Sequence, residues 1–119
     1  MRDRTAENLV VRLIVETSSR AIVWHVQDAP RLLRLGTDDI YSLYMETAFK
    51  GKRIALYELK YSEFVDGEQY WNSTLVIAML DEGDRVLWQY KGYDPEMREL
   101  FSDVRRSLTD VDTFLNYFR

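Results

Sequence analysis

Residues 40–80 read IYSLYMETAFKGKRIALYELKYSEFVDGEQYWNSTLVIAML, and this stretch decides the fold. Apolar, aromatic and β-branched residues run through three long segments, as is typical of strands. A short turn at 50–52 separates the first two, and Asp66-Gly67, a dipeptide typical of two-residue hairpins, separates the last two. Strands joined by such short turns pair with their neighbours in antiparallel fashion. The stretch therefore predicts three consecutive antiparallel strands over 40–49, 53–64 and 69–80.

The strand pattern continues on both sides of this stretch. Residues 85–91 follow a turn at 82–84 and alternate between apolar and polar positions. Residues 21–27 also alternate, with Ile22, Trp24 and Val26 on one face. Residues 28–39 contain proline, glycine and acidic residues, and we expect a loop there with a short turn near 31–35. The sheet is therefore predicted to be a five-stranded antiparallel meander.

Helical patterns flank the predicted sheet. Residues 5–19 place apolar side chains at steps of three and four, with Thr5 as the expected cap and with Val11 and Val15 widening the buried face. Asp94-Pro95-Glu96 is typical of a helix start. Its apolar stripe runs to Leu108 and resumes over 111–118, as one bent helix or as two. The fold class is therefore α+β, with an N-terminal helix, a β-meander and a C-terminal helix or pair, packed on one sheet face.

Length and composition limit the other possibilities. A chain of 119 residues fits one domain, residues 1–119. It has no cysteine, which excludes disulfides and thiolate metal sites. Arg12 interrupts the apolar run at 9–15, and no run is long enough to span a bilayer. We therefore expect a cytoplasmic protein that is not in the membrane. The net charge is −4, and residues 61–119 carry 6 basic and 12 acidic side chains, which disfavours a nucleic-acid partner.

The sheet face opposite the predicted core contains an apolar patch. Such patches often mark a surface for a partner or for self-association. A strongly twisted sheet that curls over the patch is the other explanation, and the sequence leaves both open. The candidate interface residues are Tyr44, Ile54, Leu56, Tyr70, Val76 and Leu87.

No other set of residues in the sequence predicts a catalytic site, a metal site or a bound cofactor. His25 is the only histidine, so it has no partner of its own kind for a metal site. Glu46 and Glu58 are predicted on one sheet face, where charge pairing across strands explains them. The three tryptophans fall on core-facing positions. A weak set of possible phosphate contacts consists of Arg31, Arg34, Lys50, Lys52 and Arg53.

Two stretches carry a resemblance. One runs from Leu13 to Trp24 and includes Thr17, and the other runs from Glu99-Leu100-Phe101 through Arg105-Arg106 to 110–115. Together they resemble a group of small uncharacterised prokaryotic α+β domains, in which a helix precedes a β-meander and a C-terminal helix. The resemblance covers most of the chain and implies the fold alone, because no established activity comes with the group.

These observations favour a non-catalytic role over an enzyme. We expect a protein-interaction or accessory module that binds a protein partner or a second copy of itself as a homodimer. The first alternative is a small-ligand-binding domain or small enzyme, with a pocket between sheet and helices that uses Tyr57, Tyr61 or Glu58. The second is a nucleic-acid-associated protein that uses the basic residues named above.

Overall fold

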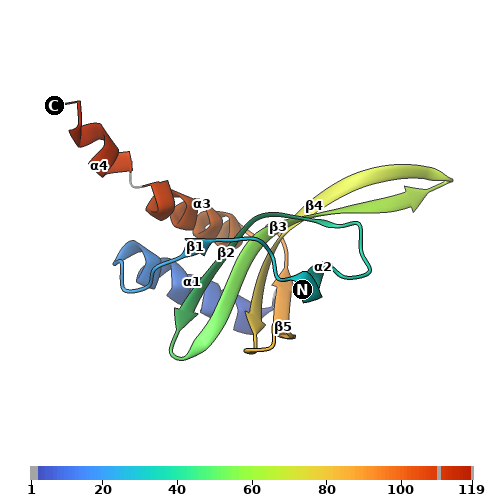
Figure 1. Ribbon diagram of the computed structural model, residues 1–119, viewed down its shortest axis with the longest axis horizontal. Coiled ribbons are helices and arrows are strands. Elements are labelled where there is room, and N and C mark those ends of the chain that lie inside the picture. The colour runs from blue at the N-terminus through green and yellow to red at the C-terminus, as the bar shows by residue number, and fades with distance from the viewer. Residues whose placement is uncertain (1–2, 110, 119) are drawn as a thin grey trace.

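The computed structural model describes residues 3–109 and 111–118. The predicted order of elements is confirmed, and every helix and strand is visible in Figure 1. The elements are α1 (Arg4–Ser18), β1 (His25–Val26), α2 (Arg31–Arg34), β2 (Ile40–Phe49), β3 (Lys52–Val65), β4 (Glu68–Leu80), β5 (Val86–Lys91), α3 (Pro95–Thr109) and α4 (Val111–Asn116).

The five strands form one antiparallel sheet in the order β1-β2-β3-β4-β5, as a meander requires. Lys50 and Gly51, and likewise Asp66 and Gly67, have positive φ angles of 54°, 77°, 52° and 80°. Two consecutive residues with positive φ twist a hairpin turn in the sense that the strands need. The hairpins predicted at these two turns are therefore confirmed. β1 is shorter than predicted, because only His25 and Val26 pair with β2.

The main core lies between the sheet and the helices α1 and α3, which pack side by side on one face. Trp24 anchors the end of α1 to this layer, because its indole Nε1 donates a hydrogen bond to Thr17 Oγ1 over 3.0 Å. Asp3, not Thr5, caps α1 and accepts a hydrogen bond from the Ala6 amide. The buried members of this core are Val10, Leu13, Ile22, Trp24, Met45, Ile54, Leu56, Leu75, Ile77, Met97, Leu100 and Val104.

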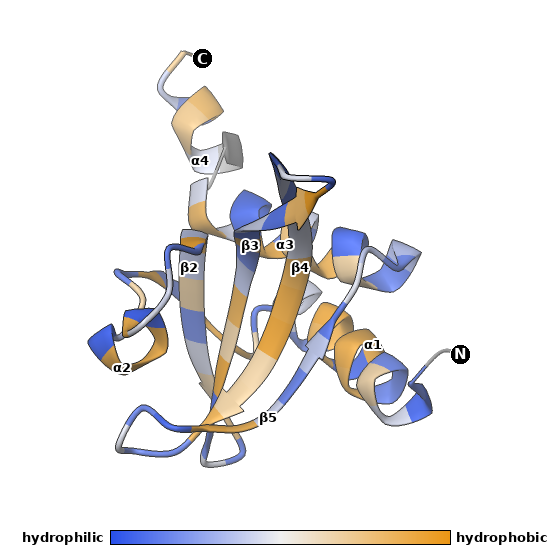
Figure 2. Cartoon of the chain, turned by 90° about the vertical axis from the view of Figure 1, so that its right-hand side faces the viewer, coloured by the Kyte–Doolittle hydropathy of each residue, from blue (hydrophilic) through white to orange (hydrophobic). Residues whose placement is uncertain are grey.

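A second core covers the other face of the sheet. The segment between β1 and β2, which includes α2, lies across this face, and Figure 2 shows α1 and α2 on opposite sides of the strands. Ala29 and Leu33 of this segment pack against the sheet. The buried strand residues of this core are Tyr44, Ala55, Tyr57, Leu59, Val76, Ala78 and Leu80. The second face is thus closed over its central part, and the sheet has two packed sides.

The predicted face of β3 was wrong. Leu56 pairs with Ile77, and Ile54 with Met79, so both lie on the face that the helices cover. Tyr57 and its alternate neighbours lie on the α2 side. The residues 54–57 are all buried, whichever way they point. Hydrophobicity alone therefore does not show which side of the sheet each β3 side chain faces. The pairing of β3 with β4 determines it.

A β-bulge in β2 caused a second error in the predicted faces. The register with β3 shifts between Ser42 and Met45, and Leu43 has a φ of 50°. An extra residue in one strand moves all later side chains to the other face. Tyr41 therefore lies on the α2 side, whereas Met45 lies on the helix side, although unbroken alternation had placed both on one face.

Two segments extend from the body of the molecule, at opposite ends of its long axis (Figure 1). One is the outer part of the β3–β4 hairpin, and the other is α4 with the end of the chain. They explain why the molecule measures 56 × 34 × 30 Å. Val11 and Val15, which were expected to be buried in α1, are instead 45% and 52% exposed.

Candidate functional site

The outer part of the β3–β4 hairpin, residues 62–71, is the most exposed apolar part of the sheet and is called the arm below. Its two strands pair without interruption from Arg53 and Leu80 out to Val65 and Glu68. The neighbouring strands end earlier, because β2 begins opposite Lys60 and β5 ends opposite Val76. The arm is therefore a two-stranded ribbon with both faces and both edges open.

Four large apolar side chains of the arm are exposed. Phe64 is 72% exposed, Trp71 53%, Val65 52% and Tyr70 48%. Directly paired residues point to the same face, so Phe64 and Trp71, which occupy diagonal positions, share one face. This is the face that continues from the helix-covered side of the sheet. The arm therefore exposes two aromatic side chains to solvent on the same face.

A shallow pocket adjoins Trp71 at the base of the arm. Its volume is about 330 Å³, and it is lined by Ile40, Lys60, Trp71, Asn72 and Ser73. Ile40 is itself 50% exposed. Interfaces commonly place an apolar anchor of one partner in a pocket beside an aromatic residue of the other. Ile40 and Trp71 line this pocket, and Phe64 lies on the same face further along the arm, so the composition of this face suits such a site.

All charged side chains of the arm are acidic. The arm carries Glu63, Asp66 and Glu68 and no basic residue. Two of these carboxylates have partners within the ribbon, because Tyr70 donates a hydrogen bond to Glu68 and Asn72 donates one to Glu63. The register places Glu63 and Glu68 on the face opposite Phe64 and Trp71, so the arm has one apolar and one acidic face.

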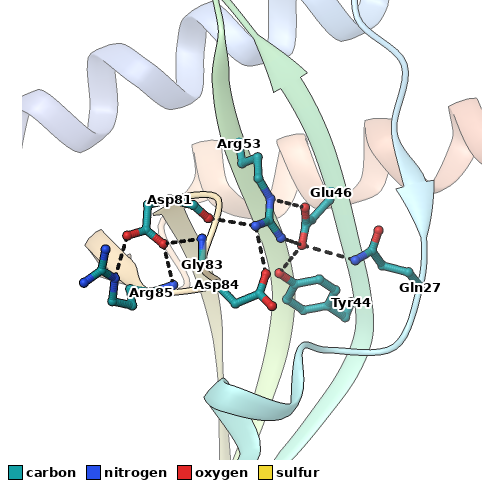
Figure 3. Close-up of polar contacts among 8 residues, drawn as sticks. All are labelled: Gln27, Tyr44, Glu46, Arg53, Asp81, Gly83, Asp84 and Arg85. Carbon is teal, nitrogen blue, oxygen red and sulfur yellow. Dashed lines mark hydrogen bonds and ion pairs between the residues drawn. The ribbon is translucent and has the colours of Figure 1, made fainter.

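An ion network lies on the α2 side of the sheet, and Figure 3 shows it in close-up. Glu46 is 9% exposed and accepts two hydrogen bonds from the Arg53 guanidinium, at 3.0 and 2.9 Å. It also accepts one from the Tyr44 hydroxyl at 2.6 Å and one from the Gln27 amide at 3.2 Å. Arg53 further donates to the Asp81 carbonyl and to Asp84, both at 2.8 Å. The network ties β2 and β3 to the turn that precedes β5.

The electrostatics of this network indicate a structural role. Hydrogen bonds to Glu46 raise the pKa of the Arg53 guanidinium further above its ordinary value, so it stays charged. Burial, followed by the hydrogen bond to Glu46, raises the pKa of Tyr44 well above 10. A general base needs a lone pair free for its substrate. The Glu46 carboxylate instead accepts four hydrogen bonds. This arrangement favours a structural role, in which Glu46 links neighbouring strands, over catalysis.

The predicted interface residues are not one surface. Tyr44 and Val76 are buried on the α2 side, whereas Ile54 and Leu56 are buried under the helices. Tyr70 and Leu87 are exposed, at 48% and 65%. Ile54 and Leu56 leave the predicted face because the direction of β3 is the reverse of the expected one, as corrected above. Tyr70 is the one member that belongs to the arm.

The basic residues are also separated. Arg31 and Arg34 lie on α2, which contacts the start of β2 through the hydrogen bond from Tyr41 to the Leu33 carbonyl. Lys50 and Lys52 lie beyond the other end of β2, about 25 Å away at the rise of a strand. Arg53 is engaged by two carboxylates. The structure does not bring the five cations together.

The other candidates also separate. Glu46 and Glu58 lie on opposite faces, since Glu58 pairs with Ser42 before the bulge and Glu46 pairs with Ala55 after it. Glu58 likewise faces away from Tyr57, so the residues proposed for a small-ligand pocket do not converge. His25 is exposed on β1. Among the described residues, no group of three or more potential metal ligands is found.

Two further pockets lie on the α2 side of the sheet rather than between sheet and helices. One, of about 280 Å³, lies beside the segment that precedes β2, and its lining includes Asp28, Arg34 and Tyr44. The other, of about 470 Å³, is lined by Asp39, Leu59, Tyr61, Ser62, Thr74 and Lys91. Of the three residues expected at a ligand site, Tyr61 lines the second of these pockets, whereas Tyr57 and Glu58 line neither.

The arm was missed because Trp71 was assigned to the core from its alternation with Leu75 and Ile77. The alternation is correct, but the helices do not extend that far. A signal was present in strand length. β3 and β4 have 14 and 13 residues, whereas β2 and β5 have 10 and 6. A central hairpin that is longer than its neighbours must project beyond the sheet.

Comparison with known proteins finds no matching family model, no matching curated protein and no matching solved structure. In the described part of the chain, no helix has both the length and the apolar character needed to cross a membrane.

Proposed function

We propose that this protein is a non-catalytic protein-interaction module whose contact surface is the arm. The observation that carries the proposal is the pair of aromatic side chains, Phe64 and Trp71, exposed on one face of a projecting ribbon. Aromatic residues dominate the energetics of protein interfaces because they bury a large area with few rotatable bonds. A two-stranded ribbon of this kind is also only marginally stable alone, so contact with a partner would stabilise it.

The alternatives have less support. The space between the sheet and the helices is occupied by the main core, and the expected ligand-binding residues lie on different faces. The basic side chains that would contact a nucleic acid are spread over two ends of β2. We further propose that the protein is prokaryotic and cytoplasmic, as expected from the sequence.

The proposal is tested by photo-cross-linking in cells that express the chain. A photoreactive benzoylphenylalanine at position 64 is compared with the same residue at position 87, which is also exposed on the sheet but lies outside the arm. We expect a protein adduct of defined mass from position 64 only. The partner, identified and purified, should bind the wild type at least about ten-fold more tightly than Trp71→Ser. Equal adducts from both positions, or no adduct, would contradict the proposal.

A further inference from the structure

The second extension of the molecule, α4, carries an apolar surface of its own. Phe114, Leu115, Tyr117 and Phe118 are 58%, 50%, 83% and 73% exposed. The rings of Phe114 and Phe118 contact each other edge to face, with centroids 5.3 Å apart. Their spacing of four residues, with Leu115 beside them, forms one apolar face on the end of the chain. Figure 1 shows that α4 projects away from the sheet and from α1.

We propose that the partner of the arm is a second copy of this chain, and that the arm of each copy binds α4 of the other. This proposal rests on the proposed function of the arm. The two apolar surfaces lie at opposite ends of the 56 Å long axis. Two copies placed side by side and antiparallel therefore bring each arm to the partner's α4. The contact then occurs twice, related by a two-fold axis, and the assembly closes as a dimer.

Charge disfavours the competing arm–arm contact. The arm is acidic, with Glu63, Asp66 and Glu68 and no basic residue. The end of α3 that leads towards α4 exposes Arg105 and Arg106, which line a shallow pocket of about 270 Å³, and the sequence from 102 to 118 also contains three aspartates. Two arms in contact would bring only carboxylates together, whereas an arm on α4 of a second copy meets charges of both signs, which favours the arm–α4 contact.

The available area supports two contacts rather than one. An aromatic side chain can bury roughly 150–250 Å², so the exposed parts of Phe64, Trp71 and Ile40 supply roughly 300 Å² of apolar surface, and α4 a similar amount. One such contact is smaller than the roughly 800 Å² per partner of a specific interface. Because each copy contributes both an arm and an α4, the closed dimer approaches that size, whereas a single contact does not.

The mass in solution tests the proposal. We expect the full chain at about 100 µM to have twice the single-chain mass of 14.2 kDa by light scattering, because interfaces of this size dissociate at micromolar concentrations or below. An arm variant, Phe64→Ser with Trp71→Ser, and an α4 variant, Phe114→Ser with Phe118→Ser, should each be monomeric. The matched control, Val23→Ser with Leu87→Ser, removes side chains that are 66% and 65% exposed elsewhere and should remain dimeric.

Mixing the two variants is specific to this geometry. The α4 variant supplies an intact arm and the arm variant supplies an intact α4, so the mixture regains one of the two contacts. Because one contact alone is small, we expect the mixture to form a heterodimer only at concentrations at least about ten-fold above those at which the wild type dimerises. Each variant alone should remain monomeric at those concentrations, with unchanged circular dichroism throughout. A monomeric wild type, an assembly larger than two copies, or a dimer that survives either variant would overturn the proposal. A monomeric wild type whose position 64 still cross-links to a different protein would overturn it and leave the proposed function standing, whereas no adduct at all would remove both.

Discussion

Arg53 shows how single residues hold this sheet together. Its guanidinium joins Glu46 on β2 to Asp84 and to the Asp81 carbonyl in the turn before β5. The sequence suggested a phosphate contact for this arginine, because it follows Lys50 and Lys52 at a turn. The structure places Glu46 opposite Ala55 and turned towards the same side as Arg53. The Arg53 guanidinium is therefore neutralised by carboxylates of the same chain, and it in turn compensates the charge of the buried Glu46 carboxylate.

Loss of this guanidinium should destabilise the fold. Arg53→Met leaves the Glu46 carboxylate 9% exposed without its ionic partner, and we expect the free energy of unfolding to fall by about 2 kcal/mol in urea denaturation. The control is Arg85→Met, which breaks an exposed pair with Asp81 and should cost less than about 0.5 kcal/mol. Equal losses of unfolding free energy in the two variants would show that the Arg53–Glu46 ion pair does not stabilise the fold more than an exposed pair does.

The buried tyrosines predict the behaviour at high pH. Burial raises the pKa of Tyr57 well above the unfolded value of 10.0. Above pH 10 the unfolded chain therefore loses a proton that the folded chain keeps, and the free energy of unfolding falls as pH rises. Below pH 10, Tyr57 is protonated in both the folded and the unfolded chain, so this loss of stability is absent there. We expect Tyr57→Phe to reduce this slope in urea denaturation between pH 8 and 11, by up to about 1.4 kcal/mol per pH unit. An unchanged slope would contradict the assignment.

At the scale of elements, the β3–β4 hairpin has two parts with different roles. The inner part, through Leu59 and Leu75, is buried in the two cores, whereas the arm contributes no buried residue to either. We therefore expect the arm to be dispensable for folding and available for binding.

Shortening the hairpin separates these two roles. Ser62 and Trp71 are directly paired, so replacing residues 63–70 with Asn-Gly rejoins the strands through a two-residue turn. We expect the free energy of unfolding to change by less than about 1 kcal/mol, because no core side chain is removed. Binding of the partner should be lost. A large loss of stability with binding intact would assign the arm to the fold instead.

The elements of this fold were readable from the sequence because turns and periodicity are local signals. Asp66-Gly67 specifies its hairpin, and the stripe from Met97 to Leu108 specifies a helix. The faces of β2 and β3 were not readable. The bulge at Leu43 has no glycine to mark it. Ile54 and Tyr57 are both buried although they lie on opposite sides, so no polar face marks the direction of β3. The arm could not be predicted from the sequence for a related reason, because the exposure of Trp71 depends on how far the helices extend along the sheet.

The whole molecule is elongated, with the acidic arm at one end and the apolar α4, near Arg105 and Arg106, at the other (Figure 1). A head-to-tail arrangement of copies would continue into an open chain, whereas an antiparallel pair brings the unlike ends together twice and closes. The electrostatic part of that arrangement can be separated from its apolar part by exchanging charges between the two ends.

Charge reversal at either end should weaken the dimer, and reversal at both should restore it. We expect Arg105→Glu with Arg106→Glu, and separately Glu63→Lys with Glu68→Lys, to raise the dissociation constant about ten-fold or more in sedimentation equilibrium. The chain that carries all four changes should recover most of the affinity. Additive weakening in that chain would show that these charges do not face each other across the dimer.

The most direct measurement of the arm–α4 contact uses the absence of cysteine from the chain. A chain with Gln69→Cys, on the same face of the arm as Phe64, is mixed with a chain with Asn116→Cys on α4. Under mild oxidation we expect a disulfide between these two chains to form at least about ten-fold faster than between Asn116→Cys and a control with Gln89→Cys, because the dimer holds only the first pair together. Equal rates for positions 69 and 89 would contradict the arm–α4 dimer.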